Sequence, residues 1–188
     1  MIRIAIFASG AGSNAENIIT YFKDKPEVSV VMVLSNKKDA KVLERATRLN
    51  VKTLVFDRSA FSAGGDLLRM LKKEVDYIVL AGFLWRIPAD FIEAFPNKII
   101  NIHPALLPKY GGKGMYGMKV HEAVVLNNEK VTGITIHFVN EHYDEGAIIF
   151  QKQVNLSKSD TPEEVAEKIH ALEYAYFPKI IESVVLHG

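Results

Sequence analysis

Residues 2–22 read IRIAIFASGAGSNAENIITYF, and this stretch decides the fold class. Residues 2–8 are rich in β-branched side chains and end shortly before a glycine, which is typical of a buried strand. Farther on, Ile18, Ile19 and Phe22 recur at helical spacing after a polar start. A buried strand, a glycine loop and a helix in this order indicate the first unit of an open α/β sheet.

The alternation of strands and helices continues through the first half of the chain. Four more short apolar runs are predicted to be strands, at 28–35, 51–56, 76–82 and 98–102. Helices are predicted between them, at 39–49 and 66–74. Strands of nearly continuous apolar character are covered on both faces, so we expect a mostly parallel sheet with helices on both sides.

The second half of the chain changes this pattern. A helix is predicted at 117–127, followed by strands at 131–139 and 147–155 that we expect to form an antiparallel pair. A final helix starts at Thr161, with Pro162 in its first turn and acids near its positive end. No repeat or linker interrupts the chain, which favours one domain.

Composition narrows the function classes. The chain has 188 residues, 48% of them hydrophobic, which is enough for one sizeable core. Its 23 Lys and Arg balance 22 Asp and Glu, which argues against a broad nucleic-acid-binding or membrane-binding surface. Cysteine is absent, so disulfides, thiolate metal sites and a cysteine nucleophile are excluded. With no signal-peptide pattern and no long apolar run, we expect a cytoplasmic protein.

The loop SGAGSNA at 9–15 joins the first strand to the first helix, at the edge where open α/β sheets bind ligands. Its glycines fit a loose dinucleotide pattern, but no acid follows the second strand to bind ribose hydroxyls. The Gly-Lys-Ser/Thr of a P-loop is missing too. Two interpretations remain: backbone N–H groups of Gly12, Ser13 and Asn14 bind one phosphate, or Ser13 or Asn14 caps the helix.

At 98–108 the chain reads KIINIHPALLP, in which Asn101 and His103 interrupt an apolar run. Side chains two apart on a strand point the same way, so both are expected on one face at the ligand edge of the sheet. An imidazole can exchange a proton near neutral pH, and an amide can donate to an oxyanion. The pair suits attack on a carbonyl by an amine or water. The alternative is a polar strand end before Pro104, with His103 bonded to backbone carbonyls.

A third partner for the imidazole is expected in the loop NEHYDEGA at 140–147, which holds Glu141, Asp144 and Glu145. The residues alone do not choose among these acids. The alternative is an acidic, solvated turn in which Gly146 supplies the positive φ. The other histidines lack the spacing of metal ligands, so no metal is assigned to His121, His137, His142 or His170.

Motifs from both halves of the chain resemble one known family, the folate-dependent glycinamide ribonucleotide transformylases of purine biosynthesis. The motifs are SGAGSN at 9–14, LAGF at 80–83, NIHPALLPKY at 101–110, HFVNEHYDEG at 137–146 and LEYAYFP at 172–178. Their order and spacing match from residue 1 to about 180. The resemblance implies a single formyltransferase domain over 1–188, with a Rossmann-like ribonucleotide-binding half (1–100) and a catalytic, folate-binding half (101–188).

The reaction implied by this resemblance is formyl transfer from the co-substrate 10-formyltetrahydrofolate to the amine of glycinamide ribonucleotide. The resemblance makes Asn101, His103 and Asp144 the catalytic trio. Asn101 and protonated His103 would stabilise the oxyanion, and Asp144 would orient His103 and help move protons. Neither a metal nor a covalent enzyme intermediate is required.

The resemblance also assigns the binding residues. Gly12, Ser13 and Asn14 would hold the substrate phosphate, and Glu173 its ribose hydroxyls; without the resemblance, Glu173 would be expected to be an exposed helix acid. The folate-binding residues would be Leu84, Trp85, Arg86, Ile87, Asn101, Asn140, Glu141, His142, Tyr143 and Asp144. For Trp85, a place in the core or at the rim is the alternative.

The segment 111–120, GGKGMYGMKV, is longer and richer in glycine than the common form of the family. It is either a lid over the folate tail, with Lys109 or Lys113 meeting carboxylates, or a surface loop.

Four other functions are alternatives for this sequence. A formyltetrahydrofolate deformylase and a methionyl-tRNA formyltransferase each need a further domain, for which we expect no room in this chain. A non-catalytic nucleotide-binding module and a dehydrogenase are the remaining alternatives. We expect small-molecule substrates, no nucleic-acid or membrane partner, and a monomer or weak homodimer.

Overall fold

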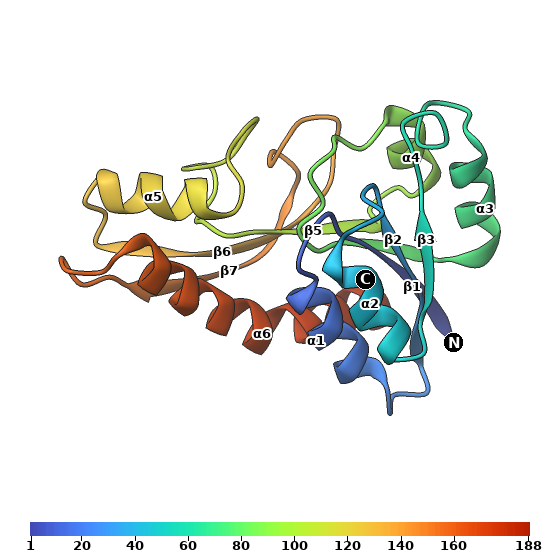
Figure 1. Ribbon diagram of the computed structural model, residues 1–188, viewed down its shortest axis with the longest axis horizontal. Coiled ribbons are helices and arrows are strands. Elements are labelled where there is room, and N and C mark those ends of the chain that lie inside the picture. The colour runs from blue at the N-terminus through green and yellow to red at the C-terminus, as the bar shows by residue number, and fades with distance from the viewer.

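Seven strands form one sheet in the computed structural model, which describes residues 1–188 (Figure 1). The strands are β1 (Ile2–Phe7), β2 (Val28–Ser35), β3 (Lys52–Val55), β4 (Tyr77–Leu80), β5 (Ile99–His103), β6 (Val131–Phe138) and β7 (Ile148–Asn155). The helices are α1 (Ser13–Phe22), α2 (Lys41–Arg48), α3 (Asp66–Glu74), α4 (Ala89–Ala94), α5 (Met118–Leu126) and α6 (Pro162–His187).

The strand order is β3-β2-β1-β4-β5-β6-β7. Every pair from β3 to β5 is parallel, whereas β6 is antiparallel to both β5 and β7. The predicted mostly parallel sheet with an antiparallel part in the second half is therefore confirmed. The predicted bounds agree with these to within two residues, and α4 is a short helix that the sequence pattern did not predict.

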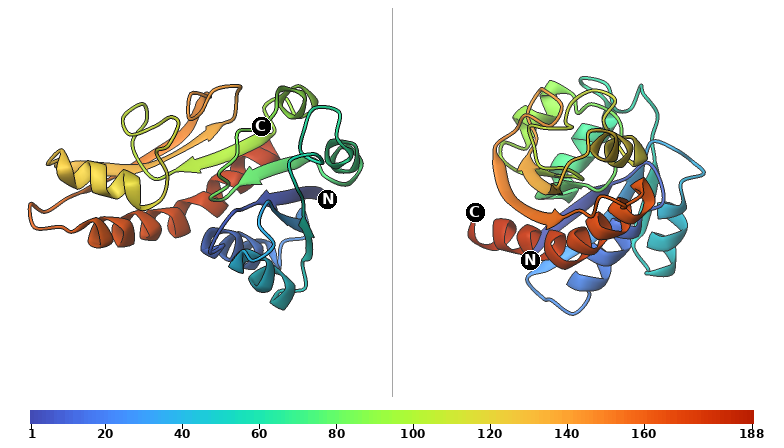
Figure 2. Two further views of the ribbon diagram at one scale, coloured as in Figure 1. Left: turned by 45° about the horizontal axis from the view of Figure 1, so that its top comes forward. Right: turned by 90° about the vertical axis from the view of Figure 1, so that its left-hand side faces the viewer.

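Side chains of β1 explain why the strands look apolar along their whole length. Ile4 and Ile6 point to a core formed with α1, α2, α5 and α6, while Ala5 and Phe7 point to a second core formed with α3 and α4. Helices thus cover both faces of the sheet (Figure 2). Since both faces are buried, both sets of alternating positions must be apolar.

The order of the strands reverses between β1 and β4. From β1 the chain continues to β2 on one side of the sheet, and from β4 it continues to β5 on the other side. Loops that leave the carboxyl ends of these two strands run to opposite faces of the sheet and open a crevice between them. The glycine loop at 9–12 follows β1, and the segment 81–88 follows β4.

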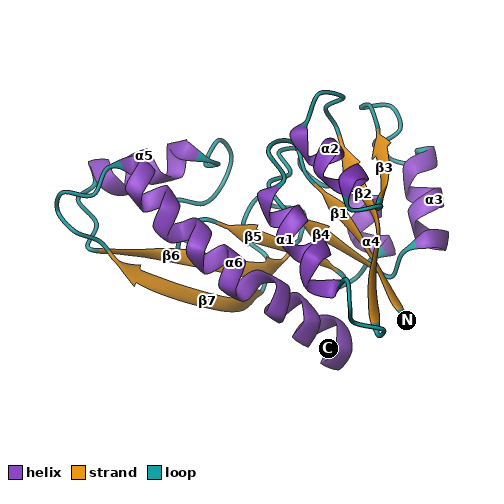
Figure 3. Ribbon diagram, turned by 60° about the horizontal axis from the view of Figure 1, so that its bottom comes forward, coloured by secondary structure: helices purple, strands orange, loops and turns teal.

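Helix α6 links the two halves of the molecule. It packs on β5, β6 and β7 and also on α1, and α5 packs against it (Figure 3). Its first turn carries a reciprocal cap, in which the Thr161 hydroxyl accepts from the Glu164 N–H and the Glu164 carboxylate accepts from the Thr161 N–H. None of the helices combines the length and the apolar character needed to cross a membrane.

Candidate active site

A cavity of about 680 Å³ opens at the carboxyl ends of β1, β4 and β5. Its walls come from the glycine loop, the segment after β4, the end of β5, the segment before α5, the loop after β6, and α5 and α6. Fourteen residues singled out in the sequence line it: Gly12, Ser13, Asn14, Leu84, Trp85, Arg86, Ile87, Asn101, His103, Asn140, His142, Tyr143, Asp144 and Glu173. Glu141 alone among the predicted site residues is not part of the wall; its side chain is exposed.

Strand β5 directs Asn101 and His103 into this cavity. Ile100 and Ile102 alternate with them and point into the core on the side of α6. Asn101 and His103 therefore share the opposite face, as their spacing predicts. His103 is only 3% exposed, so its polar atoms need partners inside the protein.

Both ring nitrogens of His103 face acceptors. Nε2–H donates to the backbone carbonyl of Tyr110 at 2.7 Å, and Nδ1 lies 3.5 Å from Oδ2 of Asp144. The alternative interpretation of His103 expects a hydrogen bond to a backbone carbonyl. That bond is present, but it uses only one of the two ring nitrogens. Tyr110 is itself fixed, because its hydroxyl donates to Glu129 at 2.9 Å.

Burial lowers the pKa of His103 below its usual value, while the negative charge of Asp144 and the hydrogen bond to Tyr110 act in the opposite direction. A nearby carboxylate thus favours the protonated form of a histidine that burial alone would keep neutral.

Among the three acids of the loop after β6, Asp144 is the one that meets His103. Glu141 and Glu145 are exposed. Burial opposes ionisation of Asp144, but its contact with His137, the charge of His103 and the Gly112 N–H outweigh burial and hold the pKa of this carboxyl below its usual value. The N–H of Gly112 donates to Oδ2 at 2.9 Å.

The backbone of this loop corrects one expectation. The residue with positive φ is Asp144, at 58°, and not Gly146. Glycine is needed at 146 for space, since a Cβ there would lie 1.6 Å from the carbonyl oxygen of Phe138. Aspartate tolerates the left-handed region better than most residues, so the carboxylate reaches the cavity without a glycine at its own position.

His137 joins this cluster, although sequence reasoning gave it no role. It lies directly opposite Asn101 in the β5–β6 pairing, and the Asn101 amide nitrogen is 3.1 Å from its Nε2. Nδ1–H donates to the carbonyl of Phe138 at 2.8 Å, so Nε2 accepts from Asn101 and leaves the second amide N–H of Asn101 free. Nε2 is also 3.7 Å from Asp144, too long for a hydrogen bond. In the sequence, His137 stands at the start of the motif at 137–146, but its contact with Asn101 depends on the register between β5 and β6.

The glycine loop ends in Gly12, which is the N-cap of α1 with φ of 76° and no side-chain hydrogen bond. The interpretation of Ser13 or Asn14 as a helix cap is therefore wrong. A Cβ on Gly12 would lie 2.4 Å from Val42, so the close approach of α2 also requires glycine. The first N–H groups of α1 have no side-chain acceptor and belong to residues on the cavity wall, an arrangement suited to an anion.

Glu173 is not the exposed acid that its helical position alone would predict. It is 6% exposed, and its carboxylate accepts from the Asn14 side chain at 2.8 Å. Burial raises the pKa of Glu173, against the lowering effects of Asn14 and of His170. A buried acid beside the glycine loop can accept hydrogen bonds from ligand hydroxyls.

The segment after β4 forms the opposite wall. Ile87 is buried in the core with α4, whereas Leu84 and Arg86 are exposed. Trp85 is half-buried at the edge of a phenylalanine cluster, and the Arg58 guanidinium lies 4.1 Å from its ring centre. Trp85 therefore lies both at the rim of the aromatic core and on the wall of the cavity.

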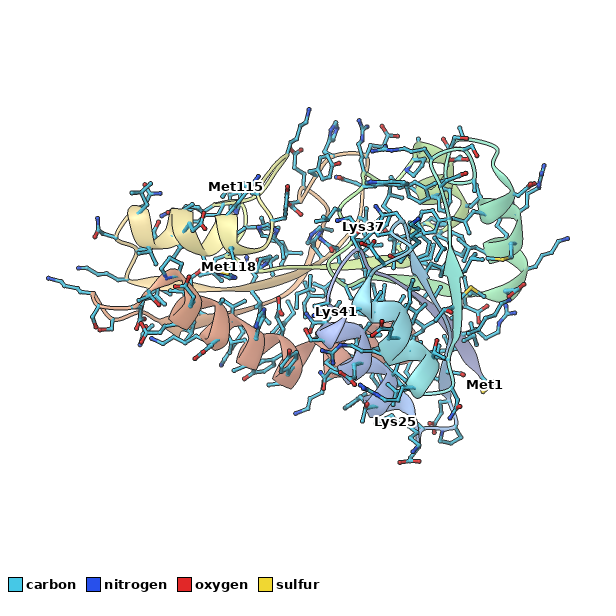
Figure 4. The ribbon with its side chains drawn as sticks, in the orientation of Figure 1. Met1, Lys25, Lys37, Lys41, Met115 and Met118 are labelled. Carbon is cyan, nitrogen blue, oxygen red and sulfur yellow. The ribbon has the colours of Figure 1, made fainter.

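The glycine-rich segment before α5 also lines the cavity, from Gly112 to Gly117. Lys113 is on this wall, whereas Lys109 pairs with Glu129 at 2.9 Å. Met115 in this segment and Lys37 after β2 are both cavity residues (Figure 4). The segment is thus a wall of the cavity tied to Asp144 through Gly112. No three His, Asp or Glu side chains are grouped so that they could hold a metal ion.

Nearly the whole chain is similar to known proteins. Residues 2–181 match the family model described as formyl transferase. The chain is 40% identical to a phosphoribosylglycinamide formyltransferase, chloroplastic, of Arabidopsis thaliana, covering 97% of this chain and 65% of that protein, and 38% identical to the protein of the same name of Vigna unguiculata, of which it covers 60%. It thus spans less than two thirds of these plant proteins.

Bacterial proteins are similar over nearly their whole length. Identity is 36% to a phosphoribosylglycinamide formyltransferase of Bacillus subtilis, covering 98% of this chain and 95% of that protein. The crystal structure of a phosphoribosylglycinamide formyltransferase from Bacillus halodurans has a TM-score of 0.87 and 34% identity, with 98% and 96% of the two chains covered.

Proposed function

Because the chain belongs to the formyl transferase family of enzymes, we propose that it transfers the formyl group of 10-formyltetrahydrofolate to the amine of glycinamide ribonucleotide, a step of purine biosynthesis. The observation that carries this proposal is the meeting of Asn101, His103 and Asp144 in one cavity with the glycine loop and Glu173. One end of the cavity suits a phosphate and a sugar, and the other suits attack on a carbonyl.

The ribonucleotide is held at the glycine-loop end. Its phosphate accepts from the N–H groups of Gly12, Ser13 and Asn14 at the positive end of α1. Its ribose hydroxyls donate to Glu173, which the Asn14 side chain orients. This places the amine toward the end of β5.

The formyl-folate lies along the segment after β4 and the loop after β6. Leu84, Trp85 and Ile87 supply apolar and aromatic surface for the pterin, and Arg86 supplies a charge on the same segment. The backbone around Asn140 and Tyr143 supplies groups for the hydrogen-bonding edge of the ring. The formyl group then faces Asn101 and His103.

The reaction follows from the positions of three side chains. The uncharged amine attacks the formyl carbon, and the carbonyl oxygen becomes an oxyanion. The free N–H of the Asn101 amide and Nδ1–H of protonated His103 donate to that oxyanion. Nε2–H stays bonded to Tyr110, so Nδ1 is the nitrogen that carries the exchangeable proton.

Asp144 takes part in the proton transfers of the reaction. Its charge favours protonation of His103, and a water held by its carboxylate accepts the proton released by the attacking nitrogen. One proton passes to the folate nitrogen as the carbon–nitrogen bond breaks, so the enzyme returns to its starting state. Acid–base help of this kind contributes about 10²–10⁴-fold, and the binding of both substrates in one cavity supplies positioning.

The test of this function follows folate release by absorbance, with and without glycinamide ribonucleotide. Release is expected only when the ribonucleotide is present. Release at an equal rate without the ribonucleotide would contradict the proposal and indicate a deformylase. Absence of any release under both conditions would instead support a non-catalytic nucleotide-binding module.

A further inference from the structure

Two buried side-chain atoms have no hydrogen-bond partner within the protein, and both belong to residues of the same cavity. They are Oδ1 of Asn14 and Nδ1 of His121. Asn14 is already among the predicted ribonucleotide-binding residues, whereas His121 has no assigned role. Buried polar atoms in folded proteins are nearly always paired. Because both residues line the cavity, a bound molecule can supply the missing partner.

His121 is held rigidly at this wall. It is 3% exposed and lies on α5, between the buried neighbours Val120 and Val124. Helix α5 packs against α6, which carries His170 and Glu173. No carboxylate pairs with His121; burial, with the charges of His170 and His103, lowers its pKa to about 4. The imidazole is therefore neutral at pH 7, with one donor and one acceptor nitrogen.

The surroundings of His121 indicate which part of a ligand it meets. His121 lines the same cavity as His103 on β5 and Glu173 on α6, and its helix α5 packs on α6. It can therefore meet a ligand that extends between these two residues. In a glycinamide ribonucleotide, the part between the reacting amine and the phosphate consists of an amide and a ribose. These groups are neutral, and each can donate and accept hydrogen bonds, which matches a neutral imidazole.

We propose that His121 is a specificity-determining residue that hydrogen-bonds the neutral amide or ribose portion of the ribonucleotide, an inference that rests on the function proposed above. The competing explanation is a histidine that serves only the packing of α5 on α6. The two explanations differ in what an apolar replacement does. A packing histidine can be replaced by leucine without loss of ligand affinity, whereas a ligand-binding histidine cannot.

The test is isothermal titration calorimetry with glycinamide ribonucleotide in the absence of folate, so that binding is measured without turnover. His121→Leu and His121→Phe are expected to weaken binding by roughly tenfold or more, because a buried hydrogen bond to the ligand is lost. Their melting temperatures should equal or exceed that of the wild type, because an unpaired buried polar atom is removed. His121→Gln should restore part of the affinity, and the exposed control His187→Gln should bind like the wild type.

Titration with ribose 5-phosphate locates the contact. If the His121 variants lose as much affinity for ribose 5-phosphate as for glycinamide ribonucleotide, the contact is with the ribose. If they lose affinity for glycinamide ribonucleotide only, the contact is with the amide. Wild-type affinity in either apolar variant would overturn the proposal. Failure of both apolar variants to fold would overturn it as well, since His121 would then serve the core. A wild-type protein that does not bind the ribonucleotide would instead contradict the proposed function itself.

Discussion

At the scale of single residues, the site depends on two buried carboxylates with opposite pKa shifts. Asp144 has partners that favour its charge and lower its pKa. Glu173 is buried with fewer such partners, so its pKa is raised. The first is therefore suited to support a protonated histidine, and the second to accept hydrogen bonds from hydroxyls. Separate environments thus suit the same functional group to the two roles proposed for it in one cavity.

Replacement of Asp144 by asparagine tests the first role. Asp144→Asn should lower kcat by roughly 10²–10⁴-fold with little change in KM, because the carboxylate acts on the proton and not on substrate binding. Asp144 raises the pKa of His103 against burial, so its loss should lower that pKa further. The pH range in which turnover declines as His103 loses its proton should then move to lower pH.

Glu145→Gln, one residue along the chain and exposed, is the matched control and should leave kcat unchanged. Equal losses of kcat and affinity in Asp144→Asn, or an unchanged pH profile, would contradict the role of Asp144.

Replacement of Glu173 by glutamine separates binding from stability. The folded pKa of Glu173 is raised above the unfolded value, so its contribution to stability is present below the unfolded pKa and is lost as pH rises through the folded pKa. Glu173→Gln should therefore melt at a higher temperature than the wild type at pH 8, and this difference should vanish near pH 4. Its ribonucleotide affinity should fall roughly 10–100-fold, because hydrogen bonds to a charged group are lost.

Calorimetry at two pH values and ribonucleotide titration measure both effects. The exposed Glu167→Gln on the same helix should show neither of them. A stability loss in Glu173→Gln at pH 8 would mean that the carboxylate stabilises the fold.

At the scale of elements, α6 brings Glu173 to the first turn of α1, 159 positions earlier in the chain, as the Asn14–Glu173 hydrogen bond shows. The first N–H groups of a helix have no acceptor within the helix, so α6 needs other partners to fix its start. The Thr161–Glu164 cap supplies that fixed start.

Thr161→Ala should reduce the free energy of unfolding by about 1 kcal/mol, which for a chain of this size lowers the melting temperature by about 2–4 °C. kcat and KM should stay at wild-type values, because Glu173 lies several turns from the cap. Thr20→Ala, whose hydroxyl bonds only to a carbonyl of its own helix, is the comparison and should change stability less. A fall in kcat/KM in Thr161→Ala would mean that the helix end is coupled to the site.

Individual elements also show how far the sequence could predict this molecule. The strands and most helices followed from apolar periodicity, because both faces of the sheet are buried. The short helix α4 was missed, since six residues carry too little periodicity to identify a helix. The placement of Asn101 beside His103 followed from strand geometry alone.

The rest of the site could not be predicted from local patterns. His137 meets Asn101 only through the register between β5 and β6, which is a contact between segments 36 residues apart. The positive φ of Asp144 has no signal in the sequence. Glycine is required at 146 because the carbonyl of Phe138 lies too close for a Cβ. Glu173 became a buried residue because α6 packs on α1, which no helical pattern reveals.

At the scale of the whole molecule, the sheet reverses its strand order beside the cavity, so loops from both faces converge on one crevice. The antiparallel strands β6 and β7 extend the sheet and carry the loop with Asp144 back to His103. One continuous sheet, with α6 packed on it, therefore positions the glycine loop, Glu173 and the group of Asn101, His103 and Asp144 relative to one another.

The most direct test of this account follows an isotopically labelled formyl carbon from 10-formyltetrahydrofolate. In a single turnover with glycinamide ribonucleotide, the account predicts that the label appears on the ribonucleotide amine, with one labelled product for each folate released. His103→Ala should slow this transfer by roughly 10²-fold or more while the protein still binds the ribonucleotide. Label recovered as formate, or transfer at the wild-type rate in His103→Ala, would contradict the account.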